Sequence, residues 1–381
     1  MNFFATCARG TEGALRRELG QLRLHAVRGD RGGVSFEGDL GAGMKACLFS
    51  RTAMRVLLEL ARFPAPDATA LYDGARSVPW SEWLTTRTTL AVEATVRDTP
   101  ELTHSGFAAL KVKDAVVDAL REALGGRPDV DTHDPDVRIV LHLARGEATL
   151  ALDLAGEPLH KRGYRVELTP APLKETLAAA VLSLGGVAHD RAFLDPMCGS
   201  GTLAIEHALA ARRIAPGLGR PFGFQRWPAY RGSWQSAWDR MKAQAQAEAL
   251  PRAPAPIVAR DIGNKVVAAA LRNAAQAGVA ADIRIEQGDA REATPFADAG
   301  TICANPPYGE RLSGGDDPVQ RKKLEGFYRG FASALSRFHG WQAVILSGSP
   351  LLDRAIPLTP EVRHRLWNGP LETRLLRYRL T

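Results

Sequence analysis

The second half of the chain alternates short apolar runs with helical patterns, and this alternation constrains the fold more than any other feature. A helical pattern at Pro172–Leu184 precedes an apolar run that ends at Asp195. Further strands are expected at Ile257–Asp261, Ile283–Asp289, Thr301–Ala304 and Ala343–Ser347. Strands that alternate with helices are typical of a parallel sheet, because parallel neighbours need a crossover connection that is usually a helix.

The chain closes on two more predicted strands, Val362–Trp367 and Thr373–Leu380, separated by the turn residues Asn368-Gly369-Pro370. Such a pair can form an antiparallel hairpin at the edge of the sheet. We therefore predict an α/β domain over residues 165–381, with a mostly parallel sheet and an antiparallel terminal hairpin. A segment at about 212–256 separates the first two strands and is expected to be an insertion.

The first half of the chain has a different order of elements. A strand at Phe3–Thr6 and a helix at Glu12–Leu19 come first. Later the order is strand, helix, strand, strand, at Thr89–Val96, Phe107–Leu124, Val137–Leu143 and Ala148–Leu154. This order over so short a span predicts small α+β modules and not a continuation of the parallel sheet.

Composition limits the class of protein without identifying it. The 381 residues carry a formal charge of +7, which favours a polyanionic partner but does not name one. The start of the chain has no basic segment before an apolar core, and the longest apolar stretch is shorter than the ~20 residues of a spanning helix. The four cysteines have no metal-ligand spacing. We expect a cytoplasmic protein, with no membrane and no metal.

A glycine-rich turn follows the strand that ends at Asp195. It reads Asp195-Pro196-Met197-Cys198-Gly199-Ser200-Gly201-Thr202 and opens a helix at Leu203–Ala211. Glycines at such a turn let backbone N–H groups approach a ligand closely. The turn lacks both the third glycine of the dinucleotide fingerprint and the lysine of a phosphate-binding loop. Asp195, an acidic residue four positions before the first glycine, suits a ligand that bears an amino acid and a ribose better than a pyrophosphate, with Gly199, Ser200 and Gly201 as further contacts.

Three aspartates stand at the ends of successive predicted strands. They are Asp195, Asp261 and Asp289. The carboxyl ends of parallel strands form the usual ligand edge of such a sheet. There Asp261 can accept both ribose hydroxyls and Asp289 can accept from an adenine amino group, although either could instead cap a helix.

The fourth strand leads into Asn305-Pro306-Pro307-Tyr308 at the same edge. The exocyclic amine of a nucleobase is a poor nucleophile, because its lone pair is delocalised into the ring. The Asn305 side-chain oxygen and the Pro306 carbonyl can accept its two N–H bonds and direct the lone pair at a sulfonium methyl group. Neither proline has an N–H, and Pro307 restricts Pro306 to extended geometry. Tyr308 offers a flat face on which a flipped base can stack.

With these residues in place, the chain resembles the bacterial large-subunit ribosomal RNA guanine-N2 methyltransferases that carry an N-terminal THUMP domain. Beyond the glycine turn and the Asn-Pro-Pro-Tyr loop, the resemblance rests on segments spread over nearly the whole chain. They are Ala8-Arg9-Gly10, residues 111–118, Leu152-Asp153-Leu154-Ala155-Gly156, Arg162-Gly163-Tyr164-Arg165, residues 174–180, Gly309-Glu310-Arg311-Leu312 and Asn368-Gly369-Pro370-Leu371.

The resemblance implies a ferredoxin-like module at residues 1–60, a THUMP RNA-binding domain at 61–160 and a Rossmann-like class I methyltransferase domain at 165–381. It further implies S-adenosyl-L-methionine as cofactor and 23S ribosomal RNA, or a large-subunit assembly intermediate, as partner. Some relatives carry a second domain that makes 7-methylguanine, an activity not expected of this chain. Gly263 stands where relatives often have a second Asp, which concerns the ribose contacts.

Several basic and aromatic residues are candidates for contacts with RNA. Phosphate contacts that position RNA without reading its sequence are expected from Lys111, Lys113, Arg162, Arg165 and Arg311. The insertion holds five aromatic residues that either pack it onto the catalytic sheet or form a wall of the base pocket: Phe222, Phe224, Trp227, Trp234 and Trp238.

Three other functions stay open on the sequence alone. A transfer-RNA guanine-N2 methyltransferase is close, because THUMP modules occur there too. Adenine-N6 chemistry is compatible with the loop, which does not separate adenine from guanine. A non-catalytic RNA-binding assembly factor would be expected to have lost a glycine, Asp261 or Asn305, and none is lost.

Overall fold

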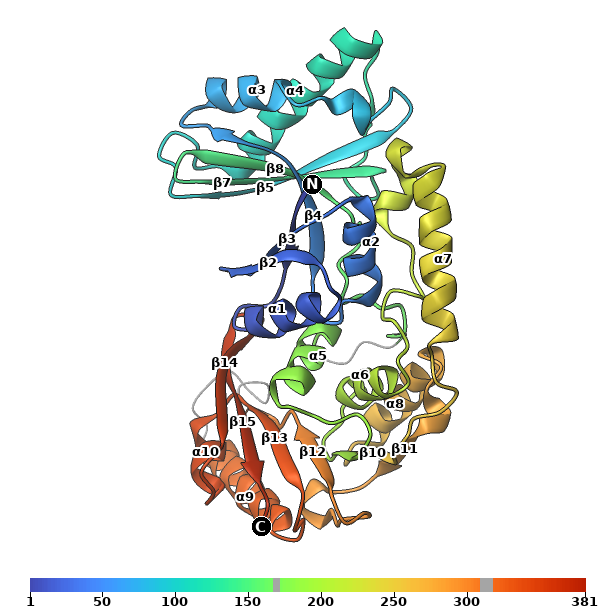
Figure 1. Ribbon diagram of the computed structural model, residues 1–381. Helices are drawn as coiled ribbons and strands as arrows, with labels where there is room; N and C mark the ends of the chain where they lie inside the picture. The colour runs from blue at the N-terminus through green and yellow to red at the C-terminus, as the bar shows by residue number, and fades with distance from the viewer. Residues whose placement is uncertain (167–171, 309–317) are drawn as a thin grey trace. The chain divides into compact units, whose positions relative to one another are not determined.

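The computed structural model describes residues 1–166, 172–308 and 318–381 (Figure 1). They divide into two compact units. The first contains residues 1–6, 18–159 and 220–244, and the second contains residues 7–17, 160–219 and 245–381. Two segments therefore belong to the unit that is remote from them in sequence: Cys7–Arg17 packs with the second unit, and residues 220–244 pack with the first.

The first unit is built on one continuous sheet, with strand order β2-β3-β1-β4-β8-β7-β5-β6. All neighbours are antiparallel except that β5 runs parallel to both β6 and β7. The strands are β1 Asn2–Thr6, β2 His25–Asp30, β3 Gly33–Glu37, β4 Arg55–Pro64, β5 Thr89–Arg97, β6 Asp129–Val130, β7 Val137–Ala144 and β8 Glu147–Asp153.

Strand β4 joins the two halves of this sheet, β2-β3-β1 and β8-β7-β5-β6. Its first half pairs with β1, and from Leu57 onward it pairs with β8. Helix α4 lies beside α3 over one face of the β5–β7 region (Figure 1). The helices of this unit are α1 Glu12–Gln21, which begins in the segment counted with the second unit, α2 Leu40–Phe49, α3 Ala68–Arg76, the short η1 Trp80–Glu82 and α4 Ser105–Leu124.

The aromatic residues of the insertion belong to the first unit, so the expectation that they pack the insertion onto the catalytic sheet was wrong. Trp227 is 1 % exposed and meets Trp83 edge to face, with ring centroids 5.8 Å apart. Phe222, Phe224 and Trp238 are buried against one another. These four rings are part of the core of the first unit and are not placed to form the wall of a base pocket, whereas Trp234 is partly exposed. The segment also includes the short η2 Gly223–Arg226 and η3 Pro228–Tyr230, and α7 Ser233–Ala247.

The second unit confirms the predicted α/β class. Its strand order is β11-β10-β9-β12-β13-β15-β14. The neighbours from β11 to β13 are parallel, whereas β15 is antiparallel to both β13 and β14. The expected terminal hairpin is thus present. The strands are β9 Ala192–Asp195, β10 Ile257–Asp261, β11 Ile283–Gln287, β12 Gly300–Ala304, β13 Gln342–Ser347, β14 Val362–Asn368 and β15 Leu371–Arg379.

Helices cover both faces of this sheet, because successive residues of each strand point to opposite sides. On β9, Phe193 packs with the α5–α6–α8 side, and Leu194 packs with the α9–α10 side. The same alternation on β13 places Val344 and Ile345 in opposite cores. The helices are α5 Glu175–Leu184, α6 Thr202–Ala211, α8 Asn264–Gln276, α9 Pro318–Leu335 and α10 Pro350–Ala355, with short turns η4 Ala280–Asp282 and η5 Ala290–Glu292.

No helix in the part of the chain that the structure describes is both long and apolar enough to cross a membrane.

Candidate active site

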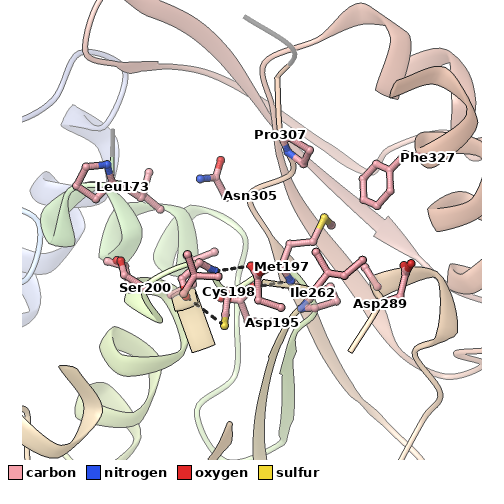
Figure 2. Close-up of a pocket in the computed structure, with 18 of the residues that line it drawn as sticks. Leu173, Asp195, Met197, Cys198, Ser200, Ile262, Asp289, Asn305, Pro307 and Phe327 are labelled. Carbon is pink, nitrogen blue, oxygen red and sulfur yellow. Dashed lines mark hydrogen bonds between the residues drawn. The ribbon is translucent and has the colours of Figure 1, made fainter. Parts of the chain in front are cut away.

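A pocket of about 490 Å³ lies at the carboxyl ends of β9, β10 and β12. The strand order reverses between β9 and β12, and such a switch point opens a crevice for ligands in α/β sheets. Figure 2 shows Asn305 and Pro307 on one side of this pocket, with Asp195, Ser200 and Ile262 on the other. Of the predicted site residues, the lining includes Asp195, Gly199, Ser200, Asp261, Asp289 and Asn305.

The glycine turn has backbone geometry that favours glycine at two positions. Gly199 has φ +52° and Gly201 has φ +85°, a region in which a Cβ atom clashes with the backbone. The Gly201 N–H donates to the Cys198 carbonyl at 2.8 Å, and α6 begins at the next residue, Thr202. Thr202 and Leu203 of the first turn of α6 line the pocket, and the first-turn amides of a helix have no intrahelical acceptor, so this helix start favours an anionic group.

Asp195 carries a buried carboxylate with unused hydrogen-bonding capacity. Its residue is 1 % exposed, and its Oδ1 atom accepts from the Met197 N–H at 3.3 Å. Its Oδ2 atom is buried and has no hydrogen-bond partner among the residues that the structure describes. Burial raises the pKa of Asp195 well above its ordinary value, and the nearby Asp261 charge adds to the rise. A buried acceptor of this kind is costly unless a ligand supplies the donor, so the site fits a cationic or N–H-bearing ligand group.

Asp261 ties the end of β10 to the glycine turn. Its Oδ2 atom accepts from the Gly199 N–H at 2.9 Å, and its Oδ1 atom accepts from the Gly263 N–H at 2.9 Å. Each carboxylate oxygen can accept more than one hydrogen bond. Asp261 therefore orders the turn and still has lone pairs for a ligand in the pocket.

Asp289 differs from the expectation that it ends the third strand. Strand β11 stops at Gln287, and Asp289 caps the short helix η5 by accepting from the Arg291 N–H at 2.8 Å. The Arg291 guanidinium also donates to both carboxylate oxygens, and these bonds lower the pKa of Asp289. The residue lines the pocket, but much of its accepting capacity is engaged by Arg291.

The Asn-Pro-Pro-Tyr loop leaves β12 directly toward the pocket. Asn305 and Pro307 line the pocket, whereas Pro306 is buried behind them. Tyr308 is 6 % exposed, and its ring lies against Gly348. Its hydroxyl donates a hydrogen bond to Asn305 Oδ1. The flat face expected to receive a base is therefore covered in this structure, while the hydroxyl contacts the amide that was expected to accept from the amine.

A tyrosine on α9 supports the loop from behind. Tyr328 is fully buried, and its hydroxyl donates to the Pro307 carbonyl. Burial raises the pKa of Tyr328 to about 12, so it stays a neutral donor at physiological pH. Sequence analysis missed this residue, because nothing in a helical pattern marks one buried tyrosine as a loop contact.

The predicted RNA-binding arginines occupy unexpected environments. The Arg162 side chain is 3 % exposed and lies 3.7 Å from Glu206, and the Arg165 side chain is 12 % exposed and bonded to residues around the glycine turn. Both guanidinium groups are enclosed by the protein, an environment that differs from the solvent-exposed one expected of a phosphate contact. On α4, Lys111 and Lys113 are partly exposed; Lys111 lies over Phe107, and Lys113 pairs with Asp114. Arg311 lies outside the described residues.

Two apolar residues of the pocket were also missed by sequence analysis. Ile262 is 66 % exposed, an unusual position for a large aliphatic side chain, and Phe327 on α9 lies near Pro307 and Asp289 (Figure 2). Ile262 directly follows Asp261 at the strand end, which is a signal that could have identified it. Together they offer apolar surface on which a flat ring can pack.

Comparison with known proteins identifies the family of this fold and site. The family described as "RMKL-like, methyltransferase domain" matches residues 162–377. The chain belongs to this RMKL-like methyltransferase family. In the first unit, a THUMP domain matches residues 65–153, and an RlmL ferredoxin-like domain matches residues 2–57.

Curated relatives of this RMKL-like protein include "Ribosomal RNA large subunit methyltransferase K/L" of Syntrophotalea carbinolica and of Methylococcus capsulatus. They are each 42 % identical to it, over 99 % and 98 % of this chain. These alignments cover 53 % and 50 % of the relatives, so the chain spans about half the length of the curated relatives it matches.

Solved structures share the whole architecture. One described as SMU.472, a putative methyltransferase complexed with SAH, has a TM-score of 0.90 and 28 % identity, covering 100 % of this chain and 98 % of that one. A predicted N6-adenine-specific DNA methylase from Listeria monocytogenes has a TM-score of 0.88 at 28 % identity, covering 100 % and 96 %. TrmN from Thermus thermophilus, at 24 % identity and TM-score 0.72, covering 100 % and 99 %, shares the fold.

Proposed function

We propose that this protein transfers a methyl group from S-adenosyl-L-methionine to the exocyclic N2 amine of a guanosine in 23S ribosomal RNA. The observation that carries the proposal is the convergence of the orphaned Asp195 carboxylate, the Asp261 carboxylate and the Asn305 amide on one pocket at the switch point of the sheet. The curated relatives are named as large-subunit ribosomal RNA methyltransferases.

The residues around the glycine turn fit the proposed cofactor. The free Oδ2 atom of Asp195 would accept from the ammonium of its amino-acid part, which removes the cost of leaving that oxygen unpaired. Asp261 would accept from the ribose hydroxyls with its remaining lone pairs, and Gly199, Ser200 and Gly201 would let the cofactor approach the backbone of the turn closely. When bound, the cofactor supplies an electrophilic methyl group. The neighbour that was crystallised with SAH, the demethylated form of this cofactor, is consistent with the assignment.

For the adenine end of the cofactor we propose the Ile262, Phe327 and Asp289 region. Two apolar side chains there can enclose a flat ring, and burial of apolar surface gives about 25 cal/mol per Å². Asp289 can accept a hydrogen bond from the adenine amino group only with the lone pairs that its bonds to Arg291 leave available. This apolar enclosure accounts for an exposed isoleucine at the pocket edge.

At the target base we propose Asn305 and Pro306 as the acceptors of the amine N–H bonds, with Tyr308 orienting the Asn305 amide through its hydroxyl. An oxygen that accepts from the amine holds its nitrogen with the lone pair toward the methyl group, so rate enhancement comes from positioning. No strong general base is required, because the nitrogen becomes positively charged when it takes the methyl group from the sulfonium, and its proton then passes to solvent water. Within the described residues, no group of three His, Cys, Asp or Glu is placed to hold a metal ion.

We propose that the first unit binds the RNA, and that Lys111 and Lys113 on α4 are among its contacts with the phosphates. The exposed Phe107 and Leu110 beside Lys111 add apolar surface on the same helix. Arg311, which adjoins the reaction loop in sequence, is proposed as a further phosphate contact. Because large-subunit RNA would be its substrate, we also propose a cytoplasmic location for the protein.

The deciding experiment is mass spectrometry of ribosomal RNA from a strain that lacks this protein, before and after complementation. The proposal expects loss of one N2-methylguanosine in 23S RNA and its return with the wild-type gene. A matched complementation with Asn305→Ala should fail to restore it, although the variant still binds SAH in calorimetry. Incorporation of labelled methyl only into transfer RNA, or at N6 of adenine, would replace the substrate assignment; full turnover by Asn305→Ala would overturn the mechanism.

A further inference from the structure

Arg165 lies against the glycine turn and not on the surface where an RNA contact was expected. Arg165 directly follows Tyr164, near the point where the chain enters the second unit. The Nη1 atom donates to Ser200 Oγ at 2.9 Å, and the Nη2 atom donates to Thr202 Oγ1 at 3.0 Å. Both acceptors line the pocket and flank Gly201.

The remaining donors of the guanidinium anchor it on the opposite side. Nε donates to Glu175 Oε1 at 2.9 Å, and Nη2 also donates to the Leu173 carbonyl at 3.0 Å. Four of the five guanidinium N–H groups thus have acceptors in the protein, so the side chain has little capacity left for a phosphate. Glu175 is 4 % exposed and supplies the opposite charge.

The same turn is held from a third direction by Asn273 on α8. Its Nδ2 atom donates to the Ser200 carbonyl at 3.0 Å, and its Oδ1 atom accepts from the Val166 N–H at 3.0 Å. Asn273 is fully buried. The Arg165 side chain is therefore bonded to the turn directly, and the Val166 N–H is linked to it through Asn273. A change in the position of the turn would have to break these contacts.

We infer that Arg165 is a positioning residue for the cofactor, because it holds Ser200 and Thr202, and with them the glycine turn, in the shape that lines the pocket. The inference rests on the proposed function, because it assigns Arg165 to the cofactor part of that same site. The planar guanidinium group is required, since only its several N–H donors can reach two hydroxyls, a carbonyl and a carboxylate at once. A lysine keeps the charge opposite Glu175 but cannot make these contacts together.

The test compares Arg165→Lys with Arg212→Lys in the full-length protein. Arg212 is a matched control at the far end of α6, where its side chain is 18 % exposed and donates to the Leu250 and Gly278 carbonyls and to Asp282. Calorimetry with SAH gives the cofactor affinity without RNA. Steady-state assays give KM for S-adenosylmethionine and for RNA separately, and thermal unfolding reports stability.

Arg165→Lys is expected to weaken SAH binding about tenfold, the size of one or two lost hydrogen bonds. It should raise KM for S-adenosylmethionine in proportion, with KM for RNA and its salt dependence unchanged. Arg212→Lys should leave SAH affinity unchanged. Thr202→Val should weaken SAH binding less in the Arg165→Lys background than in the wild type, because the two changes remove one shared contact.

An unchanged SAH affinity with a raised, salt-dependent KM for RNA would overturn the inference and restore Arg165 as a phosphate contact. Equal losses of SAH affinity in Arg165→Lys and Arg212→Lys would also overturn it, because they would indicate a general loss of packing. Failure of the proposed function is a separate result, seen as absence of SAH binding by the wild-type protein.

Discussion

The phenol hydroxyl of Tyr308 donates a hydrogen bond to the Oδ1 atom of Asn305. An amide side chain can rotate so that its oxygen and nitrogen exchange places, and only the oxygen can accept from a target amine. The Tyr308 hydroxyl favours the orientation with Oδ1 facing the loop, while the Tyr308 ring is fixed against Gly348. Because the oxygen has two lone pairs, this contact leaves one of them for the substrate.

Tyr308→Phe is therefore expected to lower kcat about tenfold, the effect of one lost hydrogen bond that orients a reacting group. The ring remains, so packing on Gly348 and the thermal midpoint should stay near the wild-type values. SAH affinity should not change, because Tyr308 does not line the pocket. Single-turnover methylation with saturating cofactor measures the step directly, and a wild-type rate would show that the hydroxyl does not orient Asn305.

Some of the site could be predicted because local signals sufficed. Asp195, Asp261 and Asn305 follow short apolar runs, and the carboxyl ends of parallel strands meet at one edge whatever lies between them in sequence. The 45 residues of the insertion did not disturb this geometry, since β10 returns beside β9. The α/β class and the terminal hairpin were predictable for the same reason.

Other features depended on partners that are distant in sequence. The charge of Arg165 is visible in the sequence, but the acceptors that enclose it come from α5 and the glycine turn. Trp227 is of a residue type that can stack on a base, but it packs against Trp83, which is 144 positions earlier in the chain. A single sequence does not report such pairings, so a buried and an exposed interpretation of either residue were equally consistent with it.

Asp195 leads to a prediction about pH. Burial raises its pKa in the folded, ligand-free protein, whereas in the unfolded chain the pKa is about 3.9. The folded state therefore binds this proton more tightly. The stability that the protonated group contributes is complete below the unfolded pKa, and it is lost as the pH rises toward the raised folded value.

Asp195→Asn should consequently raise the thermal midpoint at neutral pH, because it removes a carboxylate that is buried without a partner for Oδ2. It should also weaken SAH binding at least tenfold, because the negative partner for the ammonium is gone. Asp190→Asn is the control, since Asp190 is exposed. Melting curves and calorimetry across pH measure both effects; a variant that binds SAH as tightly as the wild type would remove Asp195 from the cofactor site.

A substitution of Ile262 tests whether the apolar side of the pocket contacts the cofactor. Its side chain is 66 % exposed in the ligand-free protein, so truncation removes little packing from the fold. If a ring covers it on binding, Ile262→Ala loses contact worth roughly 1–2 kcal/mol, about tenfold in SAH affinity. Leu271→Ala, at a residue of α8 that is 47 % exposed and away from the pocket lining, should change neither affinity nor stability. Equal SAH affinities for the two variants would show that Ile262 is not covered.

Gly10 explains why an N-terminal segment belongs to the catalytic unit. It has φ +88°, and a Cβ atom there would lie 2.1 Å from the Arg365 carbonyl oxygen on β14. The adjacent Arg9 carbonyl accepts from the Trp367 N–H at 3.2 Å, and the Arg9 guanidinium lies 3.9 Å from the centre of the Trp367 ring. The close approach of the two backbones is possible only without a side chain at residue 10.

Gly10→Ala should therefore destabilise the protein by about 2 kcal/mol or more, because it combines a left-handed backbone with a direct clash. Gly13→Ala is the matched control three residues later in α1, where a Cβ atom would meet nothing within 4 Å. That change should stabilise the helix by up to about 1 kcal/mol, since alanine favours helix over glycine. Denaturant unfolding of both variants measures the difference. Equal and small effects would mean that the N-terminal segment is not packed on β14 in solution.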